Sequence, residues 1–542
     1  MDKEAVVQTH LPGTQRPPNC LKILAIFLIV LGIFFRFYHL ENKIYWHDET
    51  FTSMGISGHT LAELKQEIVN EQVTSFSTLD QYQYINPDRG IDNTVRYLIE
   101  SDPHHPPFYY VLVRLWAQIF GDSPSEVRIL SAIFSLLIIP AFYWLCLELF
   151  GSSLVGYVGI SLVAVSPLHI LFAEEARQYS LWTLICILSS AALLWAIRRE
   201  TFWSWSVYSL ILCLGFYTHL LTALVAIAHG TYVAIKQSFR LTKTALSYLC
   251  GTLVASILFL PWLLVLIGNV DTAVTQTSWL SSKFDNPFSL ILSFFNRTRA
   301  VFFDVNLAND TPWIDFGTVD SPTLYIAATA FSLFLLTYVV YFLFQEISSR
   351  KGLLFISLLG FFCTILFLLY DLIFGGVISS VFRYHLPFYV GLQLVFASVI
   401  TLHIFSDQLW QQRMGILIAS SLLIASIISD VSIMRNDSWW LNEPSHTSHE
   451  ISKAINQFDS PLLIIDDNII NLGAALVLSH QLDSKTHLLS MHEGHSLELP
   501  LEYTNIFLLD LSYSQNLFEQ ARQEGYSLRP IYPLKRLWKI SA

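Results

Sequence analysis

The densest group of reactive side chains follows the first apolar stretch of the chain. The group reads Tyr45-Trp46-His47-Asp48-Glu49-Thr50. At a bilayer surface the adjacent carboxylates of Asp48 and Glu49 can supply a general base, alone or with a metal ion or hydrogen-bond partner. The pair is also typical of a solvated helix start, because acidic side chains stabilise the first helical turn. Three further groups of the same kind favour the chemical role.

The second group reads Asp102-Pro103-His104-His105-Pro106-Pro107. Paired histidines beside Asp102 could orient an acceptor or bind a metal, whereas the prolines alone would make a rigid turn that starts a helix. The next run, to Phe120, is short and aromatic, and it carries Arg114 in its middle. We expect a helix along the membrane interface with Arg114 facing lipid headgroups or a phosphate.

The third and fourth groups lie at the ends of apolar runs. Between two such runs, Glu174, Glu175 and Arg177 precede Tyr179. Charges in so short a connection are costly unless they are paired or used, so either a structural Glu–Arg pair or a site is expected. Arg383, followed by Tyr384, opens a late apolar run. It could anchor the helix by snorkelling, or bind a phosphate with its planar fork of donors.

The elements that must position these groups are membrane helices. Of the 542 residues, 53% are hydrophobic and 13% are charged, which excludes an ordinary soluble enzyme. The net charge of −11 and the absence of basic blocks argue against nucleic acid as a partner. The cysteines form no CxxC motif, and all but Cys20 lie within apolar runs, so neither a disulfide framework nor a thiolate metal site is expected.

The apolar runs predict about eleven transmembrane helices. They start near Leu21, Val127, Val155, Tyr179, Trp203, Leu220, Leu246, Leu324, Gly352, Leu386 and Gly415. If Pro106–Phe120 lies in the interface, the basic loops fall on the side of the N-terminus, as the positive-inside rule requires. All four groups then face outward in a multi-pass plasma (inner) membrane protein whose N-terminus is cytoplasmic.

The predicted organisation has three parts. Residues 1–20 form a cytoplasmic N-terminus, 21–432 a transmembrane module, and 433–542 a small extracytoplasmic α/β domain. Outer loops are expected at 41–126, where interfacial helices lie, and at 269–322. In the tail we predict strands at Leu462–Asp466, Ile506–Leu511 and Arg536–Ile540, and helices at Ile469–Leu482 and Gln515–Gly525.

The ordered set of motifs resembles the GT-C superfamily of polytopic glycosyltransferases, which includes protein O-mannosyltransferases, lipid A aminoarabinose transferases and RgtA/B/C/D-like enzymes. The motifs are Trp46–Thr50, His105-Pro106-Pro107-Phe108-Tyr109-Tyr110, Gly121 with Arg128-Ile129-Leu130-Ser131-Ala132, Glu175-Ala176-Arg177-Gln178-Tyr179-Ser180, and Arg383-Tyr384-His385-Leu386-Pro387. They span residues 20 to 400 in order and rough spacing. The tail and the 269–322 loop lie outside this shared pattern.

The resemblance implies a polyprenyl-phosphate-sugar donor, a glycan, lipid or protein acceptor at the outer face, and inversion at the anomeric carbon. Asp48 would be the general base with Glu49 as its neighbour, and Asp102 or His104 would occupy a second polar site position. Glu175 and Arg177 would shape the sugar and phosphate pocket, and Arg383 would hold the leaving phosphate. The wider set of expected substrate-binding residues is Asp102, His104, His105, Glu174, Glu175, Arg177, Tyr179, Arg383 and Tyr384.

Two points stay open at this stage. The sequence assigns no certain cofactor, and a divalent metal ion is compatible with the residue types. The alternative function is a transporter or flippase of a polar or lipid-linked substrate, which would need ionisable residues in mid-helix and paired half-helices. The predicted spans carry few charges away from their ends, and this favours the enzyme.

Overall fold

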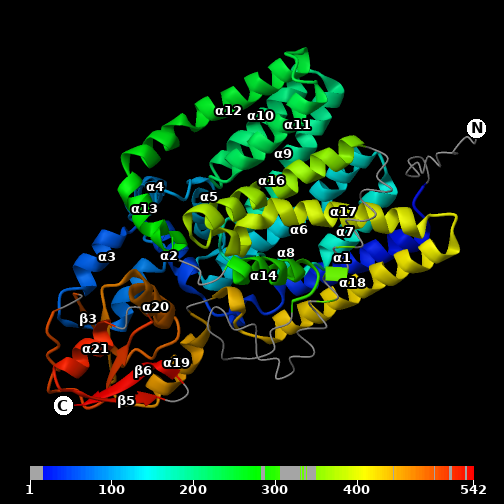
Figure 1. The fold of residues 1–542 in the computed structure, drawn as a ribbon. Coiled ribbons are helices and arrows are strands. Elements are labelled where there is room, and N and C mark those ends of the chain that lie inside the picture. Colours follow the sequence, from blue (N-terminus) through cyan, green and yellow to red (C-terminus); the bar gives the residue numbers. More distant parts are fainter. Residues whose placement is uncertain are drawn as a thin grey trace, which may run out of the picture.

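The computed structural model describes residues 16–281, 287–304, 350–442, 445–492, 495–511, 516–531 and 534–541, with isolated positions between 305 and 349. Figure 1 shows a body of long helices with the strands gathered at one end, next to the C-terminus. Within the described residues, seven helices are long and apolar enough to cross a membrane. They are α1 (Asn19–Phe37), α6 (Pro124–Phe150), α9 (Tyr179–Arg199), α12 (Lys243–Gly268), α16 (Arg350–Phe374), α17 (Leu386–Ile404) and α18 (Leu409–Arg435).

Four shorter apolar helices complete this body. They are α5 (Phe108–Phe120), α7 (Ser153–Ala164), α10 (Phe202–Phe216) and α11 (Thr222–Lys236). At 1.5 Å per residue, helices of this length rise only about 20 Å, against roughly 30 Å of hydrocarbon. Ten of the eleven expected spans coincide with helices, and the span expected near Leu324 lies outside the described residues. The number of crossings therefore stays a prediction.

Burial separates the centre of the body from its rim. The most apolar windows of α9 and α17 are 83% and 89% buried, whereas those of α1 and α12 are 28% and 17% buried. Helix α6 packs on α7 and α9, and α17 packs on α7, α16 and α18. A helix that is apolar all round and still exposed must face lipid. The rim helices α1 and α12 fit that description.

Helix α5 packs against α2 (His47–Ser57), α4 (Ile91–Ser101) and α6. Its Arg114 is fully buried and donates to the carbonyl oxygens of Ile56, Asn86 and Arg89. The expectation that Arg114 faces headgroups or a phosphate is therefore wrong. A buried guanidinium needs several acceptors, and here it fixes the C-terminal end of α2.

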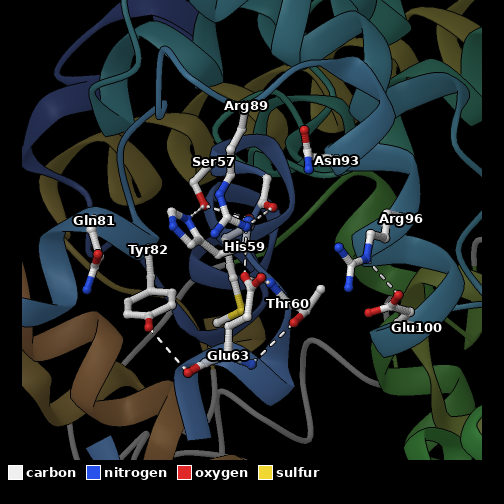
Figure 2. Close-up of polar contacts among 12 residues, drawn as sticks. Ser57, His59, Thr60, Glu63, Gln81, Tyr82, Arg89, Asn93, Arg96 and Glu100 are labelled. Carbon is white, nitrogen blue, oxygen red and sulfur yellow. Dashed lines mark hydrogen bonds and ion pairs between the residues drawn. The ribbon is translucent and has the colours of Figure 1, made fainter. Parts of the chain in front are cut away.

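A second arginine secures the same end of α2. Gly58 has a φ of +86°, a left-handed conformation that ends the helix and favours glycine. Arg89 donates to the Gly58 carbonyl at 2.8 Å and to Glu63 at 2.7 Å. Glu63 also caps α3 (Leu61–Ile68) together with Thr60, and Figure 2 shows this group of contacts. Helix α2 is thus held at its end by charged groups.

The tail forms a mixed sheet with strand order β1-β3-β2-β4-β6-β5. Strand β2 (Leu462–Asp466) is parallel to β3 (His487–Met491) and β4 (Ile506–Leu509), whereas β6 (Leu534–Ser541) is antiparallel to β4 and β5 (Ser527–Ile531). The helices are α19 (Ser448–Asn456), α20 (Ile469–Ser479) and α21 (Asn516–Gln523). All three expected strands and both expected helices are present, whereas β3, β5 and α19 were not predicted.

The sheet is not built by the tail alone. Strand β1 (Val73–Ser75) belongs to the 41–126 segment and pairs antiparallel with β3, Val73 opposite Leu489. The boundary expected at residue 433 stays a prediction, but the sheet crosses it. The remaining elements are η1 (Leu40–Asn42), η2 (Phe76–Tyr82), α8 (Pro167–Leu171), α13 (Val270–Thr277), η3 (Ser278–Ser281), α14 (Pro287–Thr298), η4 (Arg299–Val301), η5 (Ile378–Ser380), η6 (Phe382–His385), η7 (Trp440–Asn442) and η8 (Ser445–Thr447).

Candidate active site

The two adjacent carboxylates in the first turn of α2 have different surroundings. Trp46 precedes the helix in an extended conformation, and its N–H donates to Glu49 at 3.3 Å. The Glu49 side chain is fully buried, whereas that of Asp48 is 19% exposed. The helix start expected from sequence is therefore present, and only Asp48 remains accessible.

Asp48 contacts an arginine from the far end of the chain. Arg383 Nη1 lies 3.3 Å from Asp48 Oδ2, and the Arg383 side chain is 24% exposed. The guanidinium carbon also lies 5.6 Å from the ring centre of Tyr179 and 5.9 Å from that of Trp279. Burial alone would raise the pKa of Asp48, but Arg383 and Arg177 outweigh it and hold this pKa below its usual value.

Arg177 joins the first turn of α2 to the histidine loop. Its Nη1 donates to the backbone carbonyl of Asp48 at 3.1 Å and to Thr52 Oγ1 at 3.2 Å. Its Nη2 lies 3.1 Å from His105 Nε2. These contacts occupy donors on both terminal nitrogens with protein acceptors, so Arg177 fixes the backbone that carries Asp48.

The histidine loop forms a compact group around one carboxylate. His105 Nδ1 is 2.7 Å and His104 Nδ1 is 3.0 Å from Asp102 Oδ1. Burial lowers the pKa of His105 to about 4, so its ring is neutral near pH 7. A neutral ring that accepts from Arg177 at Nε2 donates to Asp102 at Nδ1.

The same three residues could hold a metal ion. Ligand atoms of Asp102, His104 and His105 all lie within 4.8 Å of one another. A carboxylate with two imidazoles is a donor set that suits zinc or a related divalent ion. The group is therefore the candidate metal site among the described residues. The positive charge of the Arg177 guanidinium beside His105 would weaken the binding of a cation there.

Glu49 belongs to a buried charge cluster behind Asp48. Arg128 Nη2 and Nε lie 2.6 and 2.8 Å from its two carboxylate oxygens, and the Ala176 N–H donates to it at 2.7 Å. Arg128 also donates to the carbonyl oxygens of Leu40 (2.7 Å) and Ile44 (2.7 Å). A bidentate pair with its remaining donors satisfied is a stable buried arrangement, and it connects α2, α6 and the turn before α9.

The two glutamates of that turn differ as well. Glu174 is buried and pairs with Lys43 at 3.2 Å. Burial and the nearby negative charges of Glu49 and Asp48 raise the pKa of Glu175 well above its usual value. Glu175 also lines a small cavity with Glu49, Glu174 and Arg128. Among the described hydrogen bonds of this turn, the one that reaches Asp48 comes from Arg177 and ends on the Asp48 backbone carbonyl.

The structure brings the four sequence groups to one place, as expected if they share one face of the molecule; which side of the membrane that face is on stays a prediction. Asp48, Arg177, His105 and Arg383 are joined by direct contacts. Tyr384 lies beside His219, with ring centres 6.2 Å apart, and His219 stacks on Trp182 at 4.2 Å. Sequence reasoning did not propose Lys43, Arg128, Trp279 or His219 as site residues. A charge inside the apolar run of α6 was the available signal for Arg128.

Comparisons with known proteins agree with this architecture. A family model described as dolichyl-phosphate-mannose-protein mannosyltransferase matches residues 104–265. The crystal structure of ArnT from Cupriavidus metallidurans bound to undecaprenyl phosphate is similar with a TM-score of 0.53 at 11% identity, covering 97% of this chain and 98% of that one. Its apo structure gives 0.51 at 11% identity, covering 96% and 98%.

A second kind of relative shares the arrangement over part of its length. The apo oligosaccharyltransferase of Archaeoglobus fulgidus gives a TM-score of 0.50 at 13% identity, covering 87% of this chain and 64% of that one. No curated protein sequence matches the chain. The likeness shows that the chain shares the fold of ArnT and of the archaeal oligosaccharyltransferase, and residues 104–265 also match the mannosyltransferase family model.

Proposed function

We propose that the chain is an inverting membrane glycosyltransferase that moves a sugar from a polyprenyl-phosphate donor to an acceptor at the outer face of a plasma (inner) membrane. The observation that carries the proposal is the contact between Asp48 and Arg383, 335 positions apart in the chain and 3.3 Å apart in the fold. A base and a phosphate-suited guanidinium thus border one site, and the donor sugar would separate them when Arg383 turns to the phosphate. The family match and the fold support the reaction class.

In the proposed reaction, Asp48 accepts the proton of the acceptor hydroxyl or amine as its heteroatom attacks the anomeric carbon. The bond from that carbon to the phosphate oxygen breaks, and the polyprenyl phosphate leaves with the electron pair. Attack from the face opposite the phosphate inverts the configuration. Arg383 neutralises the charge that develops on the phosphate, with planar donors that match its oxygens. A positioned base typically contributes about 10²–10⁴-fold in rate.

Binding of the donor would also change the base. Arg383 lowers the pKa of Asp48, so Asp48 becomes a stronger base when Arg383 turns to a phosphate. The rings of Tyr179 and Trp279 lie beside the guanidinium, with centres 5.6 and 5.9 Å from its carbon. Donor binding therefore prepares Asp48 before the acceptor proton is taken.

The other predicted site residues take supporting roles in this proposal. Glu49 is a positioning residue, because its carboxylate accepts hydrogen bonds from Arg128 and the Ala176 N–H. Arg177 is a positioning residue as well, because its donors are taken by Asp48, Thr52 and His105. The Tyr384 ring lies beside that of His219, and burial with the charges of Glu49 and Asp48 raises the pKa of Glu175. Asp102, His104 and His105 are the residues that would hold a divalent ion, which would polarise the acceptor.

The test uses purified wild type and Asp48→Asn in nanodiscs with a panel of radiolabelled polyprenyl-phosphate monosaccharides and native membrane extract as acceptor source. We expect wild type to transfer label from one donor and Asp48→Asn to lose at least about 10²-fold, since a general base supplies that factor. Asp92→Asn makes the same chemical change on the exposed side of α4 and should transfer normally.

The outcomes separate the alternatives. Near-normal turnover by Asp48→Asn would contradict the assignment of the base. No transfer from any donor, together with movement of labelled lipid across the bilayer, would favour a transporter or flippase instead.

A further inference from the structure

One face of α20 lies against the residues that lead into the base. Gly473, Val477 and His480 are spaced i, i+4 and i+7, so they share one side of the helix. The helix packs on α2. A segment at the end of the chain therefore borders the first turn of α2.

Each residue of this face meets a different residue before Asp48. Gly473 abuts His47. Val477 shares a buried apolar cluster with Trp46 and Ile44. The ring centre of His480 lies 5.2 Å from that of Tyr45, edge to face. As the chain of α20 advances, its contacts move backwards from residue 47 to residue 45. Together they cover the three residues that precede Asp48.

Hydrogen bonds from the tail fix the same stretch of backbone. The N–H of His47 donates to Ser445 Oγ at 3.0 Å, and the N–H of Ile44 donates to the Asp437 carbonyl at 2.8 Å. An N–H in the first helical turn has no partner within its own helix. The tail supplies that partner from outside, so the start of α2 depends on it.

A third connection reaches the far side of Asp48. His480 Nε2 lies 3.2 Å from Gln83 Oε1, and Gln83 Nε2 donates to the Thr50 carbonyl at 3.2 Å. The backbone is therefore tied to the tail both before and after Asp48. The base lies in the middle of a segment that the tail holds at two points.

The closest packing of this interface is at Gly473. A Cβ added there would fall inside van der Waals distance of His47 Nδ1 and Cε1 and would lie 3.1 Å from Phe51 Cε2. Gly473 is in the interior of a helix, where glycine is less stable than alanine. Glycine is needed at this helix position because α2 approaches closely, and not because of the backbone conformation. The relative position of α20 and α2 is therefore closely fixed at this point.

We propose that the face Gly473–Val477–His480 of α20 positions the base Asp48, and that the missing side chain of Gly473 sets how closely the tail approaches His47. This inference rests on the proposed function for the role of Asp48. Gly473 acts through His47 and touches no reacting atom, so it is a positioning residue. The tail is then part of the catalytic apparatus of the membrane body.

The test is a double-mutant cycle on the full-length protein in nanodiscs with Gly473→Ala, His47→Ala and the double variant. Gly473→Ala should lower kcat at least tenfold while the donor KM stays within twofold, because Asp48 moves and Arg383 does not. The double variant should regain turnover to within threefold of His47→Ala, because the ring that the new methyl meets is gone. Gly268→Ala, whose Cβ would meet nothing within 4 Å, is the matched control and should match wild type.

Several results would overturn the inference. Turnover of Gly473→Ala within twofold of wild type would show that the interface yields without moving the base. A double variant as slow as Gly473→Ala would show that the added methyl group acts on a residue other than His47. A lower kcat together with a higher donor KM and a lower yield of folded protein would indicate a merely structural effect.

Thermal unfolding midpoints of the same four proteins give a readout that needs no substrate. Non-additive shifts support the contact between residues 47 and 473, since neighbours couple and distant sites do not. Additive shifts contradict it. If wild type transfers no sugar at all, the proposed function fails, and the midpoints alone then decide whether the tail positions this turn.

Discussion

Arg128 and Arg383 bind the two adjacent carboxylates of α2 in opposite ways. Arg128 is 1% exposed and pairs with Glu49 through two nitrogens while its other donors reach backbone carbonyls. Arg383 is 24% exposed and reaches Asp48 through one nitrogen at 3.3 Å. A buried arginine whose N–H donors are all hydrogen-bonded to protein has no donor for a substrate, whereas one with a single protein contact does. This difference separates Arg128, which holds the fold, from Arg383, which can bind a substrate.

Removing the scaffold arginine should have the largest effect. Arg128→Ala leaves the Glu49 carboxylate buried without its partner, which costs about 3–5 kcal/mol. We expect loss of monodisperse protein in detergent, measured by size-exclusion yield and thermal unfolding. The double variant Arg128→Met/Glu49→Leu removes both charges and should recover much of the yield. Equal yields for Arg128→Ala and wild type would contradict the scaffold role.

Removing the other arginine should leave the fold intact. Arg383→Ala should reduce kcat/KM for the donor by about 10²–10³-fold, as the loss of one donor to a developing charge does. The unfolding midpoint should stay close to that of wild type. Arg96→Ala, in an exposed pair with Glu100, is the control. A midpoint that falls as far as in Arg128→Ala would erase the distinction between the two arginines.

An intermediate case sharpens the comparison. Arg177→Lys keeps the charge but lacks the fork that reaches Asp48, Thr52 and His105 together. We expect kcat to fall about tenfold, the donor KM to change little, and the midpoint to fall by a few degrees. A large rise of the donor KM would instead mean that Arg177 binds the phosphate.

The smallest effect concerns pH. Burial lowers the pKa values of His105 and His480 to about 4 in the folded protein, against about 6.5 in the unfolded chain. The unfolded state therefore takes up protons first, and stability present above pH 6.5 is lost as the pH falls towards 4. At pH 5.5 each of the two histidines lowers the free energy of unfolding by about 1 kcal/mol relative to neutral pH. His480→Gln should flatten the decline of the midpoint between pH 7 and 5, and an unchanged slope would contradict this.

Spacing and residue type were sufficient to predict the groups that meet at Asp48, because charges at the ends of apolar runs are costly unless they are paired or used. They were not sufficient to divide those charges into roles. Whether Glu49 or Asp48 stays accessible depends on Arg128, which lies one turn inside a different helix, and the sequence offers no register between the two. The prediction for Arg114 was wrong for the same reason, since its acceptors are backbone carbonyls whose positions are determined by the fold.

The tail shows the same division. Strands with long apolar runs, such as β2, are visible in the sequence, whereas β1 has three residues and β5 is largely exposed. Such short or polar strands are specified by their neighbours and not by their own pattern. The contact of Gly473 with His47 was beyond sequence reasoning, because it joins segments more than 400 positions apart.

The pairing of β1 with β3 has a consequence for biosynthesis. Val73 leaves the ribosome long before its partner Leu489, and β3 lies inside a sheet completed by the last strand of the chain. The loop that carries β1 therefore lacks its partner strand until β3 has been synthesised. A translation product that stops before α20 lacks both the sheet and the face Gly473–Val477–His480. It would leave β1 as an unpaired strand, and an unpaired strand edge is a template for pairing with other chains.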